Sequence, residues 1–201
     1  VLAPGIVLVT GFLLLFGDLD SVTLLDGVSI GGLGLLAILG YAVGQIVQAA
    51  GNVLESVYWR LWGGKPTHWV RTGRHTAIPL SERQVNQLQT VCTNLLGMDL
   101  KDGLSGVSSA EWGGITSQMR AALDSAGQAQ RVSIFNSNYG FHRGLTVSLF
   151  LIGVAAFTIG SLKVGTVASA GAVITLWRMH RFARHYAREL FVQVIQLPNA
   201  K

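Results

Sequence analysis

Residues 27–54 read GVSIGGLGLLAILGYAVGQIVQAAGNVL, a run of 28 residues without Asp, Glu, Lys or Arg. A helix that crosses a bilayer needs about 20 predominantly apolar residues. At about 1.5 Å of rise per residue this run would form a helix about 42 Å long, longer than a hydrocarbon core of about 30 Å. The stretch therefore predicts a helix that crosses a membrane and continues into water.

Three further stretches, 1–17, 144–162 and 164–177, also lack charged side chains. The first two have the length of a membrane span, and the third can be extended if Arg178 and Arg181 direct their charged ends to the headgroups. The first stretch has no basic start or small-residue cleavage site, so it does not resemble a signal peptide. Because the chain begins with Val, we expect further N-terminal residues in the natural protein.

The composition supports the membrane interpretation over a soluble protein with buried apolar helices. Half of the residues (50%) are hydrophobic and only 12% are charged, against about 25% charged residues in an average soluble domain. This excludes a disordered chain, which requires low hydrophobicity and high charge.

The charges between these stretches predict the orientation. The first connection contains Asp18, Asp20 and Asp26 without a basic residue, whereas residues 55–143 and 178–201 are rich in Lys and Arg. Basic segments favour the cytoplasmic side. We therefore expect a multi-pass protein with four spans and four parts. They are a transmembrane hairpin (1–54), a cytoplasmic module (55–143), a second hairpin (144–177) and a basic cytoplasmic tail (178–201).

The module reads as helical, so the predicted fold class is all-α. Ser81 begins an amphipathic pattern that ends at Gly97, and Ser108 with Glu111 matches a capping box. The apolar positions recur with helical spacing at Val85, Leu88, Val91, Cys92, Leu95, and at Trp112, Ile115, Met119, Leu123. A third helix, from about Gln128, is expected to run directly into the third span, so that a bound ligand could bias the membrane helices.

A first candidate anion site follows the second stretch. Residues 58–75 combine four aromatic residues with four Lys or Arg and two His, a mixture that suits phosphates and stacked bases. We assign to this site Arg71, Arg74 and His75. For Tyr58, Trp59 and Trp62 a belt at the membrane interface is the favoured interpretation.

A second candidate lies before the third span. Arg131, Phe135, Asn138 and His142 share one helical face. Asn can read an adenine edge, and aromatic rings can stack on bases. The predicted ligand-binding residues here are Arg131, Asn136, Asn138, Tyr139, His142 and Arg143. Packing between helices, with an arginine anchor at the membrane surface, is an equal alternative.

A basic stripe in the tail is a third candidate. Arg178, Arg181, His185 and Arg188 share a helical face. Such a stripe can bind anionic lipid headgroups, with about 1 kcal/mol from each cation. It could equally line a vestibule for an anionic ligand.

Polar residues inside the second stretch form a fourth set. Gln45, Gln48 and Asn52 share one face, and we predict that they line a pore. Gly40 and Gly44 should allow close helix packing, as should the small residues Gly165, Ser169 and Ala172. The alternative for the polar set is hydrogen-bonded packing within one subunit. Four spans enclose no wide pore, so a channel would require an oligomer.

No catalytic signature is evident. Cys92 lies on an apolar helix face, and the five histidines lack metal-binding spacing. We therefore expect neither enzymatic activity nor a metal or other cofactor.

In its organisation the whole chain resembles the membrane effectors of nucleotide-signal antiphage systems, and most closely the membrane component of Hailong-type systems. The resemblance rests on the paired spans around a basic, aromatic module, on Arg71–His75 and on Asn136–Arg143. It implies a homo-oligomer, with a tetramer favoured, in the bacterial inner membrane. An oligodeoxyadenylate from a partner nucleotidyltransferase would hold this pore closed, and loss of the signal would depolarise the cell.

Two alternatives remain open. One is a structural or regulatory membrane subunit that binds a protein partner or anionic lipid. The other is an effector opened, rather than closed, by a cyclic oligonucleotide.

Overall fold

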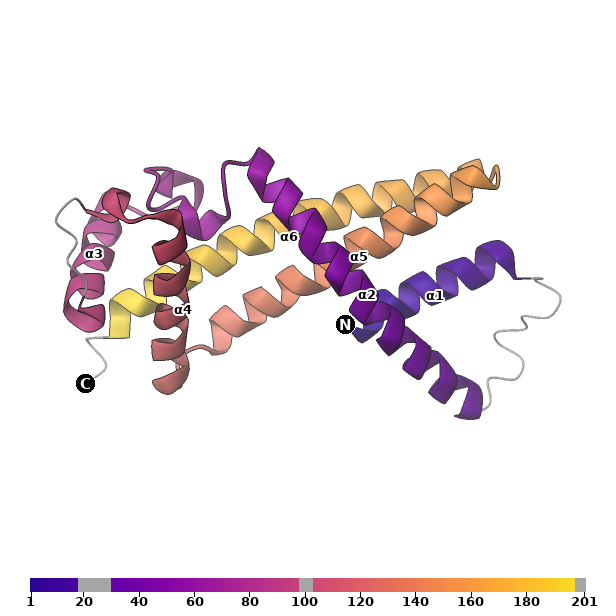
Figure 1. Ribbon diagram of the computed structural model, residues 1–201, viewed down its shortest axis with the longest axis horizontal. Helices are drawn as coiled ribbons and strands as arrows, with labels where there is room; N and C mark the ends of the chain where they lie inside the picture. Colours follow the sequence, from indigo (N-terminus) through magenta and orange to yellow (C-terminus); the bar gives the residue numbers. More distant parts are fainter. Residues whose placement is uncertain (18–29, 98–102, 198–201) are drawn as a thin grey trace. The chain divides into compact units, whose positions relative to one another are not determined.

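The computed structural model describes residues 1–17, 30–97 and 103–197 (Figure 1). Within these ranges every regular element is a helix, which confirms the predicted all-α class. The α-helices are α1 (Leu2–Phe16), α2 (Ile30–Leu61), α3 (Glu82–Leu96), α4 (Ser109–Ser125), α5 (Gln130–Thr158) and α6 (Leu162–Gln196). Three short 3-10 helices are η1 (Pro66–His68), η2 (His75–Ala77) and η3 (Leu104–Gly106). The predicted acidic connection with Asp18, Asp20 and Asp26 lies outside the described residues.

The chain divides into two compact units. Unit 1 comprises Val1–Tyr58 and Tyr139–Met179, and unit 2 comprises Trp59–Asn138 and His180–Lys201. Helices α2, α5 and α6 each contribute residues to both units. The tail, predicted as a separate part (178–201), therefore belongs from His180 onward to the same unit as residues 59–138.

In unit 1, α1 and α2 approach each other at glycines. A Cβ atom on Gly5 would overlap the Gly40 carbonyl oxygen and would lie 2.6 Å from the Gly44 nitrogen. The close packing predicted for Gly40 and Gly44 is thus confirmed, and its partner is α1. The same end of α1 also contacts α5, because the Ser148 hydroxyl donates to the Pro4 carbonyl at 2.8 Å.

Helices α5 and α6 pack through small residues, as predicted for α6. A Cβ on Gly153 would lie 2.9 Å from the Ser169 Oγ and 3.5 Å from the Gly165 carbonyl oxygen. Ala172 on α6 is buried as well. The two helices are joined at Gly160, whose φ of 79° favours glycine.

Unit 2 is built around α3, α4 and the C-terminal half of α6. Ser81 and Ser108 cap α3 and α4, each within a complete capping box. The apolar face predicted for α4 is confirmed, since its four members are buried. Trp112 donates from Nε1 to the Thr67 carbonyl at 2.7 Å, and its ring lies 6.1 Å from that of Phe191.

Two segments of the described chain are long and apolar enough to cross a membrane. They are Gly31–His68, which contains most of α2, and α5, with mean hydropathies of 1.7 and 1.4. α5 also confirms that the third helix of the module continues without a break into the third uncharged stretch. α1 is apolar but has only 15 residues, so it is about 22 Å long, shorter than a hydrocarbon core of about 30 Å.

Candidate functional site

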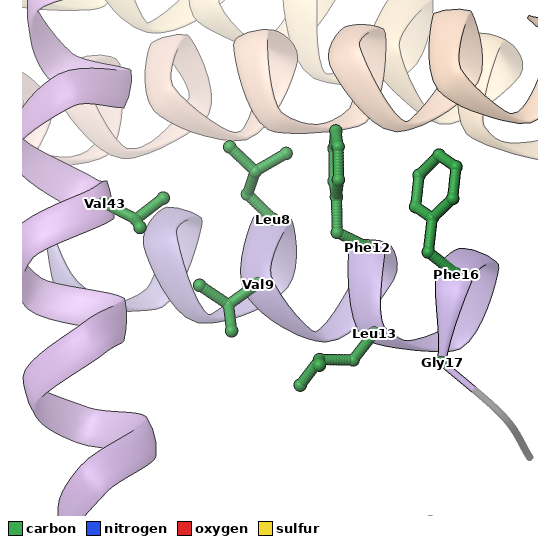
Figure 2. A pocket seen from close by; sticks show the side chains of 7 residues that line it. All are labelled: Leu8, Val9, Phe12, Leu13, Phe16, Gly17 and Val43. Atoms are coloured by element: carbon green, nitrogen blue, oxygen red, sulfur yellow. The ribbon is translucent and has the colours of Figure 1, made fainter.

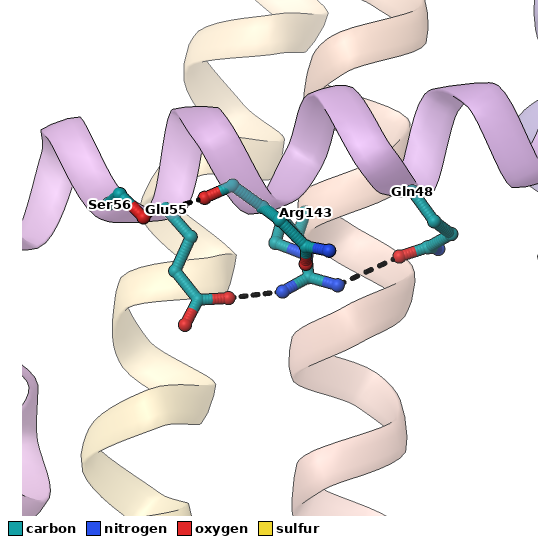
Figure 3. Close-up of polar contacts among 5 residues, drawn as sticks. Gln48, Glu55, Ser56 and Arg143 are labelled. Carbon is teal, nitrogen blue, oxygen red and sulfur yellow. Dashed lines mark hydrogen bonds and ion pairs between the residues drawn. The ribbon is translucent and has the colours of Figure 1, made fainter.

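A buried polar cluster joins α2 to α5 in unit 1 (Figure 3). Gln48, Gly51 and Glu55 lie on one face of α2. The Arg143 side chain on α5 donates from Nη2 to the Gln48 Oε1 at 2.9 Å and from Nη1 to the Glu55 Oε2. Gly51 leaves room for it, because a Cβ there would lie 3.2 Å from the Arg143 Nε.

This arrangement gives Arg143 internal partners. The side chains of Arg143 and Glu55 are only 15% and 10% exposed, and the guanidinium also lies 5.9 Å from the Tyr139 ring centre. Arg143 therefore contacts Tyr139, another predicted ligand-binding residue, as well as α2. A phosphate at Arg143 would have to compete with the Glu55 carboxylate.

The three predicted pore-lining residues have different environments in the structure. Gln48 faces α5 and binds Arg143, which is the packing role left open as the alternative. Gln45 and Asn52 are exposed on the surface of the protomer. The Asn52 carbonyl accepts a hydrogen bond from the Ser56 hydroxyl at 3.0 Å, and both residues are exposed.

His142, another predicted ligand-binding residue, is 9% exposed and packs within unit 1. Its Nε2 lies 3.2 Å from the Arg178 Nε. Arg178, the first residue of the basic stripe, thus contacts His142 of the second candidate site. One turn further along α5, the Thr146 hydroxyl donates to the Thr175 hydroxyl of α6 at 3.0 Å.

In unit 2 the remaining part of the second candidate also packs on α6. Phe135 stacks on His185, with ring centres 5.5 Å apart, and Arg131 forms an ion pair with Glu189 at 3.1 Å. These contacts correspond to the helix-packing alternative. Arg131 nevertheless keeps 69% of its side chain exposed, and the half-buried Asn138 donates to the Ile134 carbonyl at 2.9 Å. Asn136 is half-buried.

The arginines of the first candidate site brace the loops of unit 2. Arg71 donates to the Val107 carbonyl at 2.8 Å. Arg74 donates to the Trp62 carbonyl at 2.9 Å and lies 5.2 Å from the Trp69 ring centre. His75 begins η2 beside them. Arg74 is exposed and Arg71 half-buried, so this site presents its positive charge mainly through Arg74.

An aromatic cluster around His180 was not anticipated from the sequence. The rings of Trp59, Trp62 and Trp69 lie 5.2, 4.7 and 6.1 Å from the His180 ring. Trp59 is only 2% exposed, so the interface belt predicted for it is wrong: the residue belongs to the core of unit 2. The i, i+3 spacing of Trp59 and Trp62 was the available signal, but nothing local indicates a partner more than 100 residues away.

Two histidines of α6 in unit 2 have lowered pKa values. Burial lowers the pKa of His180, and the nearby Arg184 lowers it further. Burial and then the charges of Arg181, Arg184 and Arg188 lower the pKa of His185, while Glu189 acts in the opposite direction. α6 therefore presents an excess of guanidinium charge beside His185.

Unit 1 also contains an apolar groove of about 520 Å³ (Figure 2). It is lined by one side of α1, including Leu8, Phe12 and Phe16, and by Val43 of α2. The Phe12 and Phe16 rings lie 5.6 Å apart along α1. No lining side chain carries a polar group, so the groove offers only apolar contact.

Comparison of the chain with models of protein families, with curated proteins and with solved structures yields no match.

Proposed function

We propose that the chain is a subunit of an oligomeric membrane channel, controlled by an anionic oligonucleotide bound to unit 2. The observation that carries the proposal is the exposure of Gln45 and Asn52 on α2, a helix apolar enough to cross a membrane. Polar side chains at membrane depth face a partner helix or a water-filled path. Because these amides point away from the rest of their own protomer, other copies would supply that environment.

The packing of unit 2 supports a return crossing by α6. Arg184 donates to the Ala77 carbonyl at 2.7 Å, so residues on both sides of the α5–α6 hairpin belong to one compact unit. Unit 2 contains almost none of the proposed spans, so we place its residues on one side of the membrane. If α5 crosses the bilayer, the chain must cross back before His180, and residues 162–179 of α6 would be about 27 Å long.

The first crossing would be made by α1, which is apolar and packs at its start on α2 and α5. Together these arguments favour four crossings with unit 2 in the cytoplasm, as the basic character of residues 55–143 also predicts. The bacterial inner membrane, the tetramer and the role in antiphage defence by loss of membrane potential are proposed from the resemblance to Hailong-type effectors.

The charge of unit 2 supports an anionic ligand. Residues 56–81 contain Arg60, Lys65, Arg71 and Arg74 and no acidic residue. The exposed Arg74 and the largely exposed Arg131 are the best-placed cations of the predicted set. The continuity of α2 and α5 between the two units offers a route by which a ligand could bias the membrane helices.

Ion flux tests the pore. The protein is reconstituted into liposomes, and flux is measured per assembled oligomer for Gln45→Leu and Asn52→Leu. Both changes should lower flux while the oligomer persists on a sizing column, because apolar constrictions gate by dewetting. Gln48→Leu is the matched comparison: it removes the Arg143 contact and should lower stability rather than flux per oligomer. Normal flux in both exposed variants would contradict the pore assignment.

Binding of a single-stranded oligonucleotide tests the ligand. Absorbance at 260 nm of the purified protein would reveal a co-purified nucleic acid. Arg74→Ala should weaken binding and make the log–log salt dependence shallower by about 0.7. Arg83→Ala, which removes an exposed cation of α3, is the control. Equal binding by wild type and Arg74→Ala would remove Arg74 from the site.

A further inference from the structure

The end of α2 in unit 2 exposes large apolar side chains next to cations. Leu61 is 81% exposed and Trp62 44% exposed, and both Arg60 and Lys65 are exposed. Soluble surfaces commonly show single exposed apolar residues, but Leu and Trp flanked on both sides by cations are typical of a membrane-surface contact.

The backbone conformation at Gly63 and Gly64 fixes the position of this end of α2. Gly63 and Gly64 adopt positive φ angles of 73° and 107°. The Gly64 N–H donates to the Trp59 carbonyl at 2.8 Å and the Gly63 N–H to the Arg60 carbonyl at 3.3 Å, the two hydrogen bonds of a Schellman motif. α2 therefore ends sharply, directly after Leu61 and Trp62.

Side-chain contacts also hold Trp62 in position. Its ring lies 4.7 Å from that of His180, and its carbonyl accepts a hydrogen bond from Arg74 at 2.9 Å. A preorganised tryptophan loses little conformational entropy when it enters the headgroup region.

We propose that Arg60, Leu61, Trp62 and Lys65 form a docking surface for the headgroups of anionic phospholipids. Charge complementarity identifies the occupant, because both cations of this surface, Arg60 and Lys65, are exposed and residues 56–81 contain no acidic residue. The apolar pair enters the boundary between headgroups and acyl chains, and the two cations contact lipid phosphates. This inference rests on the membrane assignment of α2 in the proposed function and adds a lipid preference to it.

Photo-crosslinking identifies the occupant. The full chain carries Leu61→p-benzoylphenylalanine in membranes that contain phosphatidylglycerol and phosphatidylcholine. Crosslinks to phospholipid are expected. Crosslinks confined to a second copy of the chain, to another protein or to nucleic acid would overturn the inference.

Charge substitutions test the lipid preference. The ratio of phosphatidylglycerol to phosphatidylcholine retained by the purified protein is measured by native mass spectrometry. Arg60→Gln/Lys65→Gln should lower this preference about 30-fold, which corresponds to about 1 kcal/mol for each cation. Arg83→Gln/Arg120→Gln removes the same charge elsewhere in unit 2 and should leave the preference unchanged. An equal loss in both double variants, or no loss in the first, would contradict a local site.

Membrane fractionation separates this inference from the proposed function. If the wild-type chain leaves the membrane in a carbonate wash, both the proposed function and the lipid surface are wrong. If it stays in the membrane but the crosslinks or the lipid ratio contradict the surface, only the further inference fails.

Discussion

At the scale of single residues, the ion pair between Arg143 and Glu55 connects α5 to α2. Both side chains are largely buried, and Gln48 satisfies another guanidinium donor. Removing one partner of a buried pair leaves an uncompensated charge, whereas removing both relieves the desolvation cost. The pair should therefore tie α2 to α5.

A double-mutant cycle measures this coupling. Glu55→Gln or Arg143→Gln alone should lower the free energy of unfolding by about 3–5 kcal/mol. The double variant should be less destabilised than the sum of the two changes. Thermal unfolding in detergent is the measurement, and Arg120→Gln, which breaks the exposed pair with Asp124, should cost at most about 1 kcal/mol. Additive losses at Glu55 and Arg143 would show that the pair is not coupled.

The register of this pair could not be read from the sequence. Gln45, Gln48 and Asn52 share helical spacing, but so do Gln48, Gly51 and Glu55. Both patterns describe a continuous face, and only the position of Arg143 on α5 decides which one is buried. The sequence therefore indicated that α2 has polar positions at this depth, but tertiary packing decided which of their side chains are buried.

Stability should also depend on pH through His185. Its folded-state pKa is lowered by burial, then by Arg181, Arg184 and Arg188, against the effect of Glu189, and Phe135 stacks on its ring. As the pH falls through about 6.5, the unfolded chain therefore binds a proton at His185 more readily than the folded chain does. The free energy of unfolding of unit 2 should therefore decrease when the pH is lowered from 7.5 to 5.5.

Replacement of the histidine isolates this contribution. His185→Phe keeps a ring for the contact with Phe135 and cannot titrate, so the loss of stability at low pH should be smaller than in wild type. His180 retains its own lowered pKa, so some pH dependence should persist. Thermal unfolding followed by tryptophan fluorescence at several pH values gives the comparison, and identical profiles would exclude a role for His185.

At the scale of helices, local signals predicted more than long-range ones. The capping boxes at Ser81 and Ser108 and the buried face of α4 depend on residues three or four positions apart. In contrast, the contact of α1 with Gly40 and Gly44 and the packing of His180 among tryptophans join distant segments. A sequence shows that glycines can accept a neighbour, but it does not show which helix fills that role.

The α1–α2 contact makes a prediction at this scale. Gly5→Ala places a Cβ against the backbone of Gly40 and Gly44, so the helices must move apart, with a loss of about 1–3 kcal/mol. Gly34→Ala on α2 is the matched control because a Cβ there meets nothing within 4 Å. Helix propensity should make that variant equally or more stable. Unfolding in detergent distinguishes them, and similar stabilities would contradict the close crossing.

At the scale of the whole molecule, two described segments have the length and hydropathy of membrane spans. Residues 59–138 and those after His180 belong to one unit, which favours a return crossing through α6. The sequence predicted a fourth span from the uncharged stretch 164–177, but the pairing of α6 with the central segment needed the structure, because contacts such as that of Arg184 with Ala77 join residues more than 100 positions apart.

Cysteine accessibility tests this arrangement most directly. The native Cys92 is buried, and burial raises its pKa to about 11, so it should not react with a membrane-impermeant thiol reagent at pH 7.5. Lys163→Cys, at the start of α6, and Ser105→Cys, in η3 of unit 2, are both at exposed positions. In intact cells the reagent should label Lys163→Cys and should reach Ser105→Cys only after permeabilisation. Labelling of Ser105→Cys in intact cells, or protection of Lys163→Cys until lysis, would contradict the proposed crossings.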